Sequence, residues 1–456
     1  MGNRYLYITL LSILGFNVEA GAQHASPRLV VNIIVDQLCS DRLESFSPVY
    51  GNDGFKRLLS EGVVYSNASY SFSPVDRASG IAALSTGTTP YYNGITASEW
   101  LNRQTLRPQR CVYDEQHRYS PALLAVSTIG DELKMASNGA ARVYAVAADA
   151  DAAILAAGHA ADGALWIEQD RWTYSSYYQP LSTWATNYSR LTAAAGDANA
   201  CITELAINCA RQTGMGTDDK ADLLSVVYQA GTQMESYLSL DRCLAKLITT
   251  LGGQFGVDRV LFVLTSTGRE EEEDTEAPAA QYRIPSGLFY INRTANLLNM
   301  YLGAVYGNGK YVEQCYRNQL FLNHRLLDQK NIEAADILRR AQDFLLQISG
   351  VSNVYTSRQL LTSDSYRLER VRNGFHIDRC GDLLIEVAPG WKLVNEDTHQ
   401  TYVSRSSFIP FPIIFFGAGL KAERVQIPVA VERIAPTIAH AIHIRAPNAC
   451  SSEPLF

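Results

Sequence analysis

The sequence lacks any run of lysine and arginine, any CxxC pair, and any long apolar stretch beyond its first residues. Nucleic acids and anionic membranes are bound by basic faces, so the missing basic run and the net charge of −7 exclude both as expected partners. Zinc sites commonly use closely spaced cysteine pairs, so the eight cysteines predict no structural zinc. No transmembrane segment is expected.

The cysteines all lie beyond residue 22, in the part that we expect to be exported. An even number in an oxidising compartment permits disulfides. Cys201 and Cys209 are near enough in sequence to close a local loop. The alternative is that most cysteines are small, buried apolar side chains.

The N-terminus has the pattern of a secretory signal. Arg4 is followed by an apolar segment, Tyr5 to Phe16, and by the small residues Ala20, Gly21 and Ala22. A membrane anchor would need about 20 apolar residues, and this segment is shorter. We therefore predict that residues 1–22 are a signal peptide and that the protein is exported, periplasmic or outer-membrane-associated in a Gram-negative bacterium.

Apolar strands alternate with amphipathic helices along most of the chain. This alternation predicts an α/β fold with a doubly wound, mostly parallel sheet covered on both faces. The predicted strands are Val30–Val35, Ala141–Ala147, Leu223–Tyr228, Val260–Leu264 and Pro412–Phe416. The predicted helices are Gly54–Glu61, Arg77–Ser85, Ser127–Ser137, Ser239–Leu251, Val312–Lys330 and Ala334–Ile348.

The pattern changes between residues 311 and 391, where charged amphipathic helices precede two short strand-like segments. We predict a small α+β cap insertion there, between a first core part at 23–310 and a C-terminal core part at 392–456. The acidic run Arg269–Glu276 is expected to be a solvated loop, or otherwise a contact for a cation or a partner.

Asp36 follows the most apolar strand of the chain, Leu29 to Val35. Open α/β sheets place their chemistry at the carboxyl ends of buried parallel strands. Asp36 is therefore the first candidate site residue.

Seven segments, in this order and spacing, resemble the alkaline phosphatase superfamily, in the branch of type I phosphodiesterases, nucleotide pyrophosphatases and single-domain alkaline phosphatases. They are Val35–Leu38, Ser85–Ile95, Ala157–Ala164, Leu240–Arg242, Arg372–His376, Pro412–Gly417 and Ile434–Ile438. The resemblance covers nearly the whole mature chain. It implies two zinc ions at the strand ends, a Thr or Ser nucleophile at a helix N-terminus, and a cap above them.

Most positions that the resemblance makes catalytic carry other residues. Asp36 matches a metal ligand, but Arg77 occupies the nucleophile position, beside Asp76, and Ser98 replaces a substrate-binding amide. Thr232 and Ser236 stand near one expected ligand pair, and Thr267 and Gly268 near another. Asp149 and Asp151 replace a basic phosphate clamp, and His399 is misplaced by about two residues from the last ligand. His159 and His376 are expected to be structural.

These replacements predict an exported, catalytically degenerate pseudo-phosphatase that acts as a binding protein or as a subunit of an envelope complex. Its partner would be an unidentified envelope protein, and no cofactor would be needed.

The alternative is a metal-dependent phosphomonoesterase or phosphodiesterase with an altered active site. Asp36, Asp76, Asp149 and Asp151 would then form an oxygen-ligand site for magnesium, manganese or calcium, with His399 as the base. The family resemblance implies zinc instead, with Asp36 and His399 as the candidate ligands. If no metal is bound, a buried group of acids needs another cation, so we predict that Arg77 pairs with one or more of these aspartates.

Overall fold

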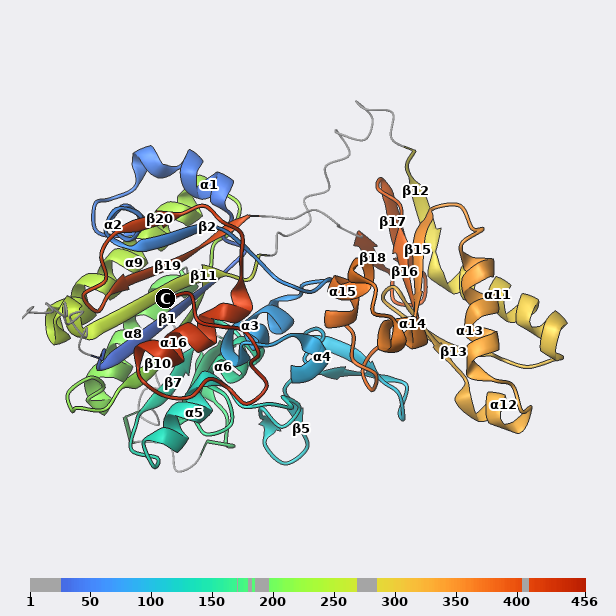
Figure 1. Ribbon diagram of the computed structural model, residues 1–456, viewed down its shortest axis with the longest axis horizontal. Helices are drawn as coiled ribbons and strands as arrows, with labels where there is room; N and C mark the ends of the chain where they lie inside the picture. Colours follow the sequence, from blue (N-terminus) through green and yellow to red (C-terminus); the bar gives the residue numbers. More distant parts are fainter. Residues whose placement is uncertain (1–25, 170, 179–182, 185–196, 269–284, 404–409) are drawn as a thin grey trace, which may run out of the picture.

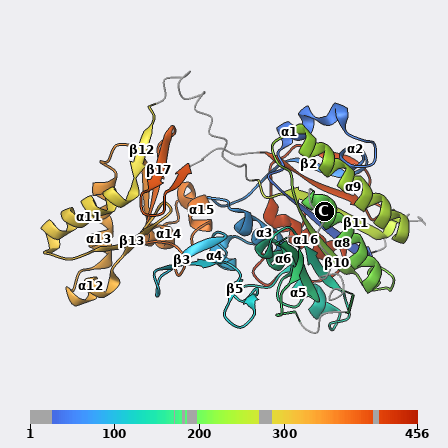
Figure 2. The same cartoon turned by 180° about the vertical axis from the view of Figure 1, so that it is seen from behind.

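The computed structural model describes residues 26–169, 171–178, 183–184, 197–268, 285–403 and 410–456 (Figure 1). The predicted signal peptide and the acidic run Arg269–Glu276 lie outside the described residues. Two lobes, a larger core and a smaller cap, meet through a narrow junction that both views show (Figures 1 and 2).

The core is built on one large sheet with the strand order β20-β2-β19-β11-β1-β10-β7-β8-β9, and β21 also pairs with β2. Its strands β1, β7, β8, β10 and β11 are parallel neighbours, whereas β19 and β9 run antiparallel to theirs. The strands are β1 (Leu29–Asp36), β2 (Val63–Ser69), β7 (Val143–Val146), β8 (Gly163–Glu168), β9 (Arg171–Tyr174), β10 (Asp222–Gln229), β11 (Val260–Ser266), β19 (Phe411–Gly417), β20 (Glu423–Val425) and β21 (Val429–Ala430).

Strand β1 lies at the centre of this sheet, and all eight of its residues are buried. Successive side chains of a strand point to opposite faces. Val30 and Ile34 accordingly pack in one hydrophobic cluster, and Val31, Ile33 and Val35 in the other. A strand that is covered on both faces needs the continuous apolar run seen in the sequence.

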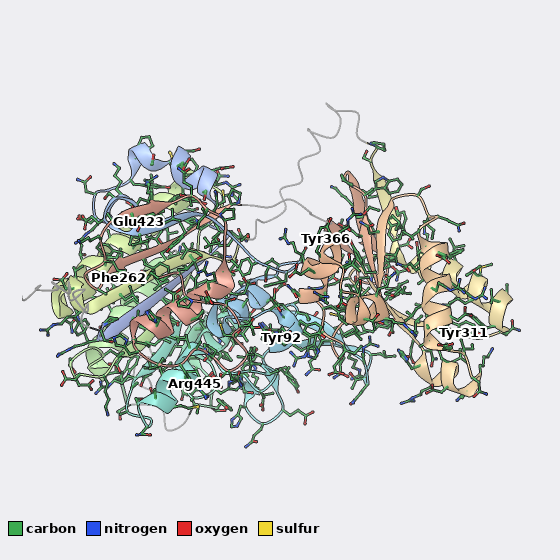
Figure 3. All side chains as sticks on the ribbon, in the orientation of Figure 1. Tyr92, Phe262, Tyr311, Tyr366, Glu423 and Arg445 are labelled. Carbon is green, nitrogen blue, oxygen red and sulfur yellow. The ribbon has the colours of Figure 1, made fainter. Side chains whose placement is uncertain are left out.

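Helices cover both faces of the sheet, which confirms the predicted doubly wound α/β fold. One face is covered by α3 (Arg77–Thr86), α5 (Ile129–Ala136), α6 (Ala150–Ala157) and α16 (Ile434–Ala441). The other is covered by α2 (Phe55–Glu61), α8 (Ala198–Thr213) and α9 (Met234–Phe255). Figure 3 shows Phe262 of β11 inside this core, where its ring stacks on Phe416 at 5.9 Å.

Short elements complete the core and extend from it toward the cap. They are α1 (Ser40–Ser45), α4 (Pro90–Asn93), β3 (Glu99–Asn102), β4 (Arg107–Arg110), β5 (Tyr113–Asp114), β6 (Arg118–Tyr119) and the 3-10 turns η1 (Ser47–Val49), η2 (Val257–Arg259) and η3 (Val431–Arg433). The β3–β4 hairpin and α4 lie beside α15 at the junction (Figures 1 and 2).

The cap consists of two small sheets with helices, and its elements run from residue 287 to residue 403. The prediction was 311–391; the range is wider because β12 pairs with β17 and α11 packs in the same hydrophobic cluster. The elements are β12 (Gly287–Tyr290), α11 (Ile291–Tyr306), β13 (Val312–Tyr316), β14 (Gln319–Leu322), α12 (His324–Gln329), α13 (Ala334–Leu345), β15 (Val351–Thr356), α14 (Ser357–Thr362), α15 (Tyr366–Asn373), β16 (Leu383–Val387), β17 (Trp391–Asn395) and β18 (Gln400–Val403).

One predicted helix, Val312–Lys330, is wrong. The segment forms the β13–β14 hairpin and only then the short helix α12. Its buried side chains alternate: Leu320 and Leu322 join the cap's main cluster, whereas Phe321 packs with Tyr316 and Leu101. That period of two, broken by Arg317 with φ of 51°, is the pattern of a hairpin with a tight turn.

The structure records all eight cysteines as free thiols, so Cys201 and Cys209, which are near enough in sequence to close a loop, are not bonded to each other. Both lie on α8, separated by two helical turns. Within the described residues, every helix is too short or too polar to cross a lipid bilayer.

Candidate functional site

The candidate site lies where β1 and β11 end and where α3 and α6 begin. Asp36 is the last residue of β1 and is 4% exposed. Thr267, just after β11, donates a hydrogen bond from Oγ1 to Asp36 Oδ1 at 2.5 Å and accepts one from the Gln37 amide at 3.3 Å. Gln37 has φ of 64°, a left-handed backbone conformation. This conformation is uncommon for residues other than glycine, and it is found more often at active sites and ligand-binding sites.

Asp76 is the N-cap of α3. Its Oδ1 accepts hydrogen bonds from the Ala78 amide at 2.9 Å, the Ser98 amide at 2.8 Å and the Ser98 hydroxyl at 2.7 Å. Ser79 completes a capping box by accepting from the Asp76 amide. The other oxygen, Oδ2, lies 4.0 Å from Nη1 of Arg317, which belongs to the cap.

Arg77 is the first residue of α3, and it confirms the predicted pairing with aspartates. Its Nη1 binds Asp149 Oδ2 at 2.6 Å, and its Nη2 binds both oxygens of Asp151 at 3.1 Å. Asp149 is the N-cap of α6 and Asp151 lies in its first turn. Burial alone would lower the pKa of Arg77, but Asp151 and Asp149 outweigh burial and raise it above its ordinary value.

Of the remaining predicted residues, Gly268 directly follows Thr267, the partner of Asp36, whereas His399 lies in the other lobe. Thr232 and Ser236 follow β10, and both are partly exposed. Gly268 has φ of 65°, and its amide donates to Ser266 Oγ at 3.0 Å. His399 lies on the exposed turn between β17 and β18, within the cap.

The predicted oxygen-ligand group of four aspartates with His399 is therefore corrected by the structure. Arg77 takes Asp149 and Asp151, and Asp76 is used to cap α3. His399 belongs to the other lobe.

The two-zinc arrangement does not fit the part of the chain that the structure describes. No three His, Cys, Asp or Glu side chains there lie close enough together to hold a metal ion. A two-metal site needs several such ligands around each ion. Asp36 instead accepts a hydrogen bond from the Thr267 hydroxyl. No catalytic step is therefore derived through zinc.

Two histidines in the family-like segments were expected to be structural. His159 Nδ1 lies 2.9 Å from Asp131 Oδ2, and its Nε2 lies 3.0 Å from the Leu124 carbonyl oxygen. The hydrogen bond to Asp131 raises the pKa of His159 against the effect of burial. His376 lies in the cap, where its Nδ1 accepts from the Asp378 amide at 3.3 Å.

A cavity of about 260 Å³ opens beside Asp76, between the core and the cap. Its lining includes Glu99 of β3 and Arg317 of the β13–β14 turn, which sequence reasoning missed. Arg317 was predicted to lie inside a helix. The residues that connect β13 and β14 are Arg317 and Asn318, and asparagine at such a position is a turn signal that could have revealed the hairpin.

The fold and the sequence were compared with known proteins. The family model for type I phosphodiesterase / nucleotide pyrophosphatase matches residues 30–408. The chain is 25% identical to alkaline phosphatase PhoV of Synechococcus elongatus, with 93% of this chain and 91% of that protein aligned. It is also 25% identical to a protein named calcium-transporting ATPase from Myroides odoratus, with 96% of each aligned.

A solved structure, wild-type alkaline phosphatase PafA, has the same fold. It superposes with a TM-score of 0.81 at 22% identity, covering 94% of this chain and 98% of that one. The PafA sequence of Elizabethkingia meningoseptica aligns over 98% of each chain at 24% identity.

These relatives overturn the prediction of a catalytically degenerate pseudo-phosphatase. Proteins named alkaline phosphatase match this chain over nearly its whole length. They agree better with the alternative prediction, a phosphoesterase with an altered active site. The family model matches residues 30–408, which is most of the chain, and the protein therefore belongs to the type I phosphodiesterase / nucleotide pyrophosphatase family.

Proposed function

We propose that this protein hydrolyses phosphoric esters, as a phosphomonoesterase or phosphodiesterase, at an altered site beside the N-terminus of α3. The observation that carries the proposal is the alignment of named alkaline phosphatases with 93–98% of the chain. The cavity of about 260 Å³ beside Asp76 supports it, because it provides room for a small ester next to the N-terminus of α3, where the resemblance places the nucleophile.

Asp76 is the proposed general base. Its Oδ1 is held by three donors, so Oδ2 is the oxygen that remains for a water molecule on the cavity side. Water gives a proton to Asp76 as its oxygen bonds to phosphorus. The ester P–O bond breaks, and the leaving alkoxide takes a proton from solvent.

Arg317 is the proposed binding group for the phosphoryl oxygens. Its guanidinium lies 4.0 Å from Asp76 Oδ2 and lines the same cavity. A guanidinium binds two phosphoryl oxygens in parallel and stabilises the charge that they carry during transfer. Arg77 is less suited to this role, because its guanidinium nitrogens Nη1 and Nη2 already pair with Asp149 and Asp151.

A divalent metal is a further element of the proposal. Its support is the likeness to proteins named alkaline phosphatase and not the carboxylates near the site; zinc is the metal that the family resemblance implies, and magnesium, manganese and calcium are the other divalent ions to be tested. We also propose an exported protein, periplasmic or outer-membrane-associated, with a partner of the cell envelope.

The test is hydrolysis of p-nitrophenyl phosphate and bis(p-nitrophenyl) phosphate by the purified protein. Elemental analysis would accompany assays of the protein as isolated, after chelation, and after addition of each of the four metals. Asp76→Asn should lower kcat by about 100-fold or more, because asparagine still caps α3 but accepts no proton.

Asp364→Asn is the matched control, because Asp364 is an exposed cap residue outside the cavity lining. It should leave kcat unchanged. Absence of turnover of both esters under every metal condition, in folded protein, would overturn the proposed function.

A further inference from the structure

Asp76 and Arg317 belong to different lobes and approach each other across the junction. Nη1 of Arg317 lies 4.0 Å from Asp76 Oδ2, a separation that allows attraction but is too long for a hydrogen bond. In the part of the chain that the structure describes, no hydrogen bond holds the guanidinium of Arg317 in place. The position of this arginine therefore depends on its neighbours in the β13–β14 hairpin.

The preceding residue, Tyr316, is the neighbour that reaches back to the core. Its side chain is buried, and the ring packs in one cluster with Phe321 of the cap. The same cluster contains Leu101 and Leu106 of the core. The Tyr316 hydroxyl donates a hydrogen bond to Glu99 Oε1, on β3 of the core. Both the ring and the hydroxyl of this tyrosine are thus fixed by contacts that cross the junction.

Tyr316 in turn fixes the guanidinium of Arg317. The guanidinium carbon lies over the Tyr316 ring, 5.8 Å from its centroid, which is within the range at which a ring face attracts a cation. The turn itself is held on β16, because Asn318 Nδ2 donates to the Ile385 carbonyl oxygen at 3.0 Å and the Ile385 amide donates to the Asn318 carbonyl oxygen at 2.8 Å. The ring and the anchored turn together direct Arg317 toward Asp76.

The core residue that accepts from Tyr316 is next to the one that holds Asp76. Ser98 immediately precedes Glu99, and its amide and hydroxyl donate to Asp76 Oδ1 at 2.8 and 2.7 Å. One short core segment therefore fixes Asp76 directly, and it fixes Arg317 through the tyrosine. The contacts form a closed ring that passes through Asp76, Ser98, Glu99, Tyr316 and Arg317.

We propose that Tyr316 and Glu99 are positioning residues of this site. The hydrogen bond between them holds Arg317 where its guanidinium binds a phosphoryl oxygen beside Asp76, and both residues act through Arg317. Because this hydrogen bond crosses the junction, the anion-binding group is in place only when the cap is docked on the core. The inference rests on the proposed function, but it concerns a binding step that can be measured without turnover.

The test is calorimetric binding of inorganic phosphate to the full chain. Tyr316→Phe keeps the ring and removes only the hydroxyl that donates to Glu99. It should weaken phosphate binding by about tenfold, because a binding group moved by about 1 Å loses that much or more. In the Arg317→Ala background the same change should have no further effect, since a positioning residue acts only through the group that it positions.

Tyr355→Phe is the matched control. Tyr355 lines the same cavity, but its hydroxyl donates to Glu386 of its own lobe. The control should leave phosphate affinity unchanged. Thermal unfolding of each variant establishes that it is folded.

Two substitutions of Glu99 separate its role as an acceptor from its charge. Glu99→Ala removes the acceptor of the Tyr316 hydroxyl, whereas the amide oxygen of Glu99→Gln still accepts from it. Glu99→Gln should therefore bind phosphate about tenfold more tightly than Glu99→Ala. Equal affinity in the two variants would show that Glu99 acts only through its charge, and this result would overturn the inference.

The remaining outcomes distinguish the inference from the proposed function. Unchanged affinity in Tyr316→Phe, with affinity lost in Arg317→Ala, would overturn the inference and leave the proposed function standing. A wild type that binds no phosphate would also overturn the inference. A loss in Tyr316→Phe that disappears in the Arg317→Ala background, in a protein that hydrolyses neither ester, would support the positioning role and refute only the hydrolysis.

Discussion

At the N-terminus of α3, one guanidinium neutralises two carboxylates that belong to another helix. Asp151 is 3% exposed at its side chain and Asp149 is 46% exposed, so only the first is fully removed from water. A buried carboxylate without a partner is costly. Arg77 therefore links α3 to α6 through these ion pairs, in addition to its place at the candidate site.

Replacing Arg77 tests this role. Arg77→Ala should lower the free energy of unfolding by about 3 kcal/mol, because Asp151 is left buried without a cation. Chemical denaturation would measure the loss. Adding Asp151→Asn to the Arg77→Ala variant should recover part of it, and a double variant no more stable than Arg77→Ala would contradict the account.

The side chain of His159 makes the free energy of unfolding depend on pH. Its partners are the Asp131 carboxylate and the Leu124 carbonyl, and its pKa is raised above the ordinary value of 6.5. A raised pKa means that the stabilisation is complete below 6.5 and is lost as pH rises through the pKa of the folded state.

The expected contribution is about 1 kcal/mol, since one charge-assisted hydrogen bond is involved and the side chain is partly exposed. The measurement is the difference in unfolding free energy between the wild type and His159→Gln from about pH 5 to pH 9. The difference should shrink toward alkaline pH. A difference that grows toward alkaline pH would show that the neutral ring is the stabilising form.

At the scale of elements, α2 begins without a side-chain cap of its own. Its N-cap is Gly54, and the carboxylate of Asp241, from α9, takes that place. Asp241 accepts hydrogen bonds from the Phe55 amide at 2.7 Å and the Gly51 amide at 2.8 Å. A Cβ atom on Gly54 would lie 2.2 Å from Asp241 Oδ1, so the close approach of the two elements requires glycine.

Removing this carboxylate should separate α2 from α9. Asp241→Ala is expected to cost about 2 kcal/mol in unfolding free energy, because the buried Phe55 amide and the partly exposed Gly51 amide lose their acceptor. Asp241→Asn should cost less, since one acceptor oxygen remains. The exposed Asp258→Ala is the control, with an expected change within about 0.5 kcal/mol. Equal losses for Asp241→Ala and Asp258→Ala would refute the capping role.

At the scale of the whole molecule, two arginines join the lobes: one belongs to the cap and contacts the core, and the other belongs to the core and contacts the cap. Arg379 of the cap donates to the carbonyl oxygens of Gly94 and Leu123 in the core, and it stacks over Trp100 at 4.7 Å. Burial lowers its pKa to about 10, so it stays charged at neutral pH. Arg103 of the core reaches Asp382 of the cap at 3.3 Å and the Cys380 carbonyl oxygen.

Removing both arginines should loosen the junction while each lobe keeps its hydrophobic core. Small-angle X-ray scattering of Arg103→Ala/Arg379→Ala is expected to give a larger radius of gyration than the wild type. Arg339→Ala/Arg367→Ala, two exposed arginines of the cap, is the control and should match the wild type. An unchanged radius in the junction variant would mean that the lobes are held by other contacts.

Patterns of neighbouring residues were enough to predict much of the core. The strand at β1 and the helix at α3 follow from periodicity and from an N-cap aspartate, which act within one element. The Arg77 pairing also followed from the sequence, because charge balance in a buried site leaves few alternatives. The helix predicted over residues 312–330 failed, because a short amphipathic segment fits a helix or a hairpin and only its packing decides between them.

The sequence by itself determined the fold class, the family and the placement of Asp36 and Arg77 at one edge of the sheet, because these depend on local periodicity and on the order of segments. The tertiary structure alone decided which acids share a cation, where His399 lies, and that Arg317 meets Asp76 across the junction. That last contact joins residues that are 241 positions apart (317 minus 76). Contacts at such a distance along the chain are set by how the two lobes pack and not by any local pattern.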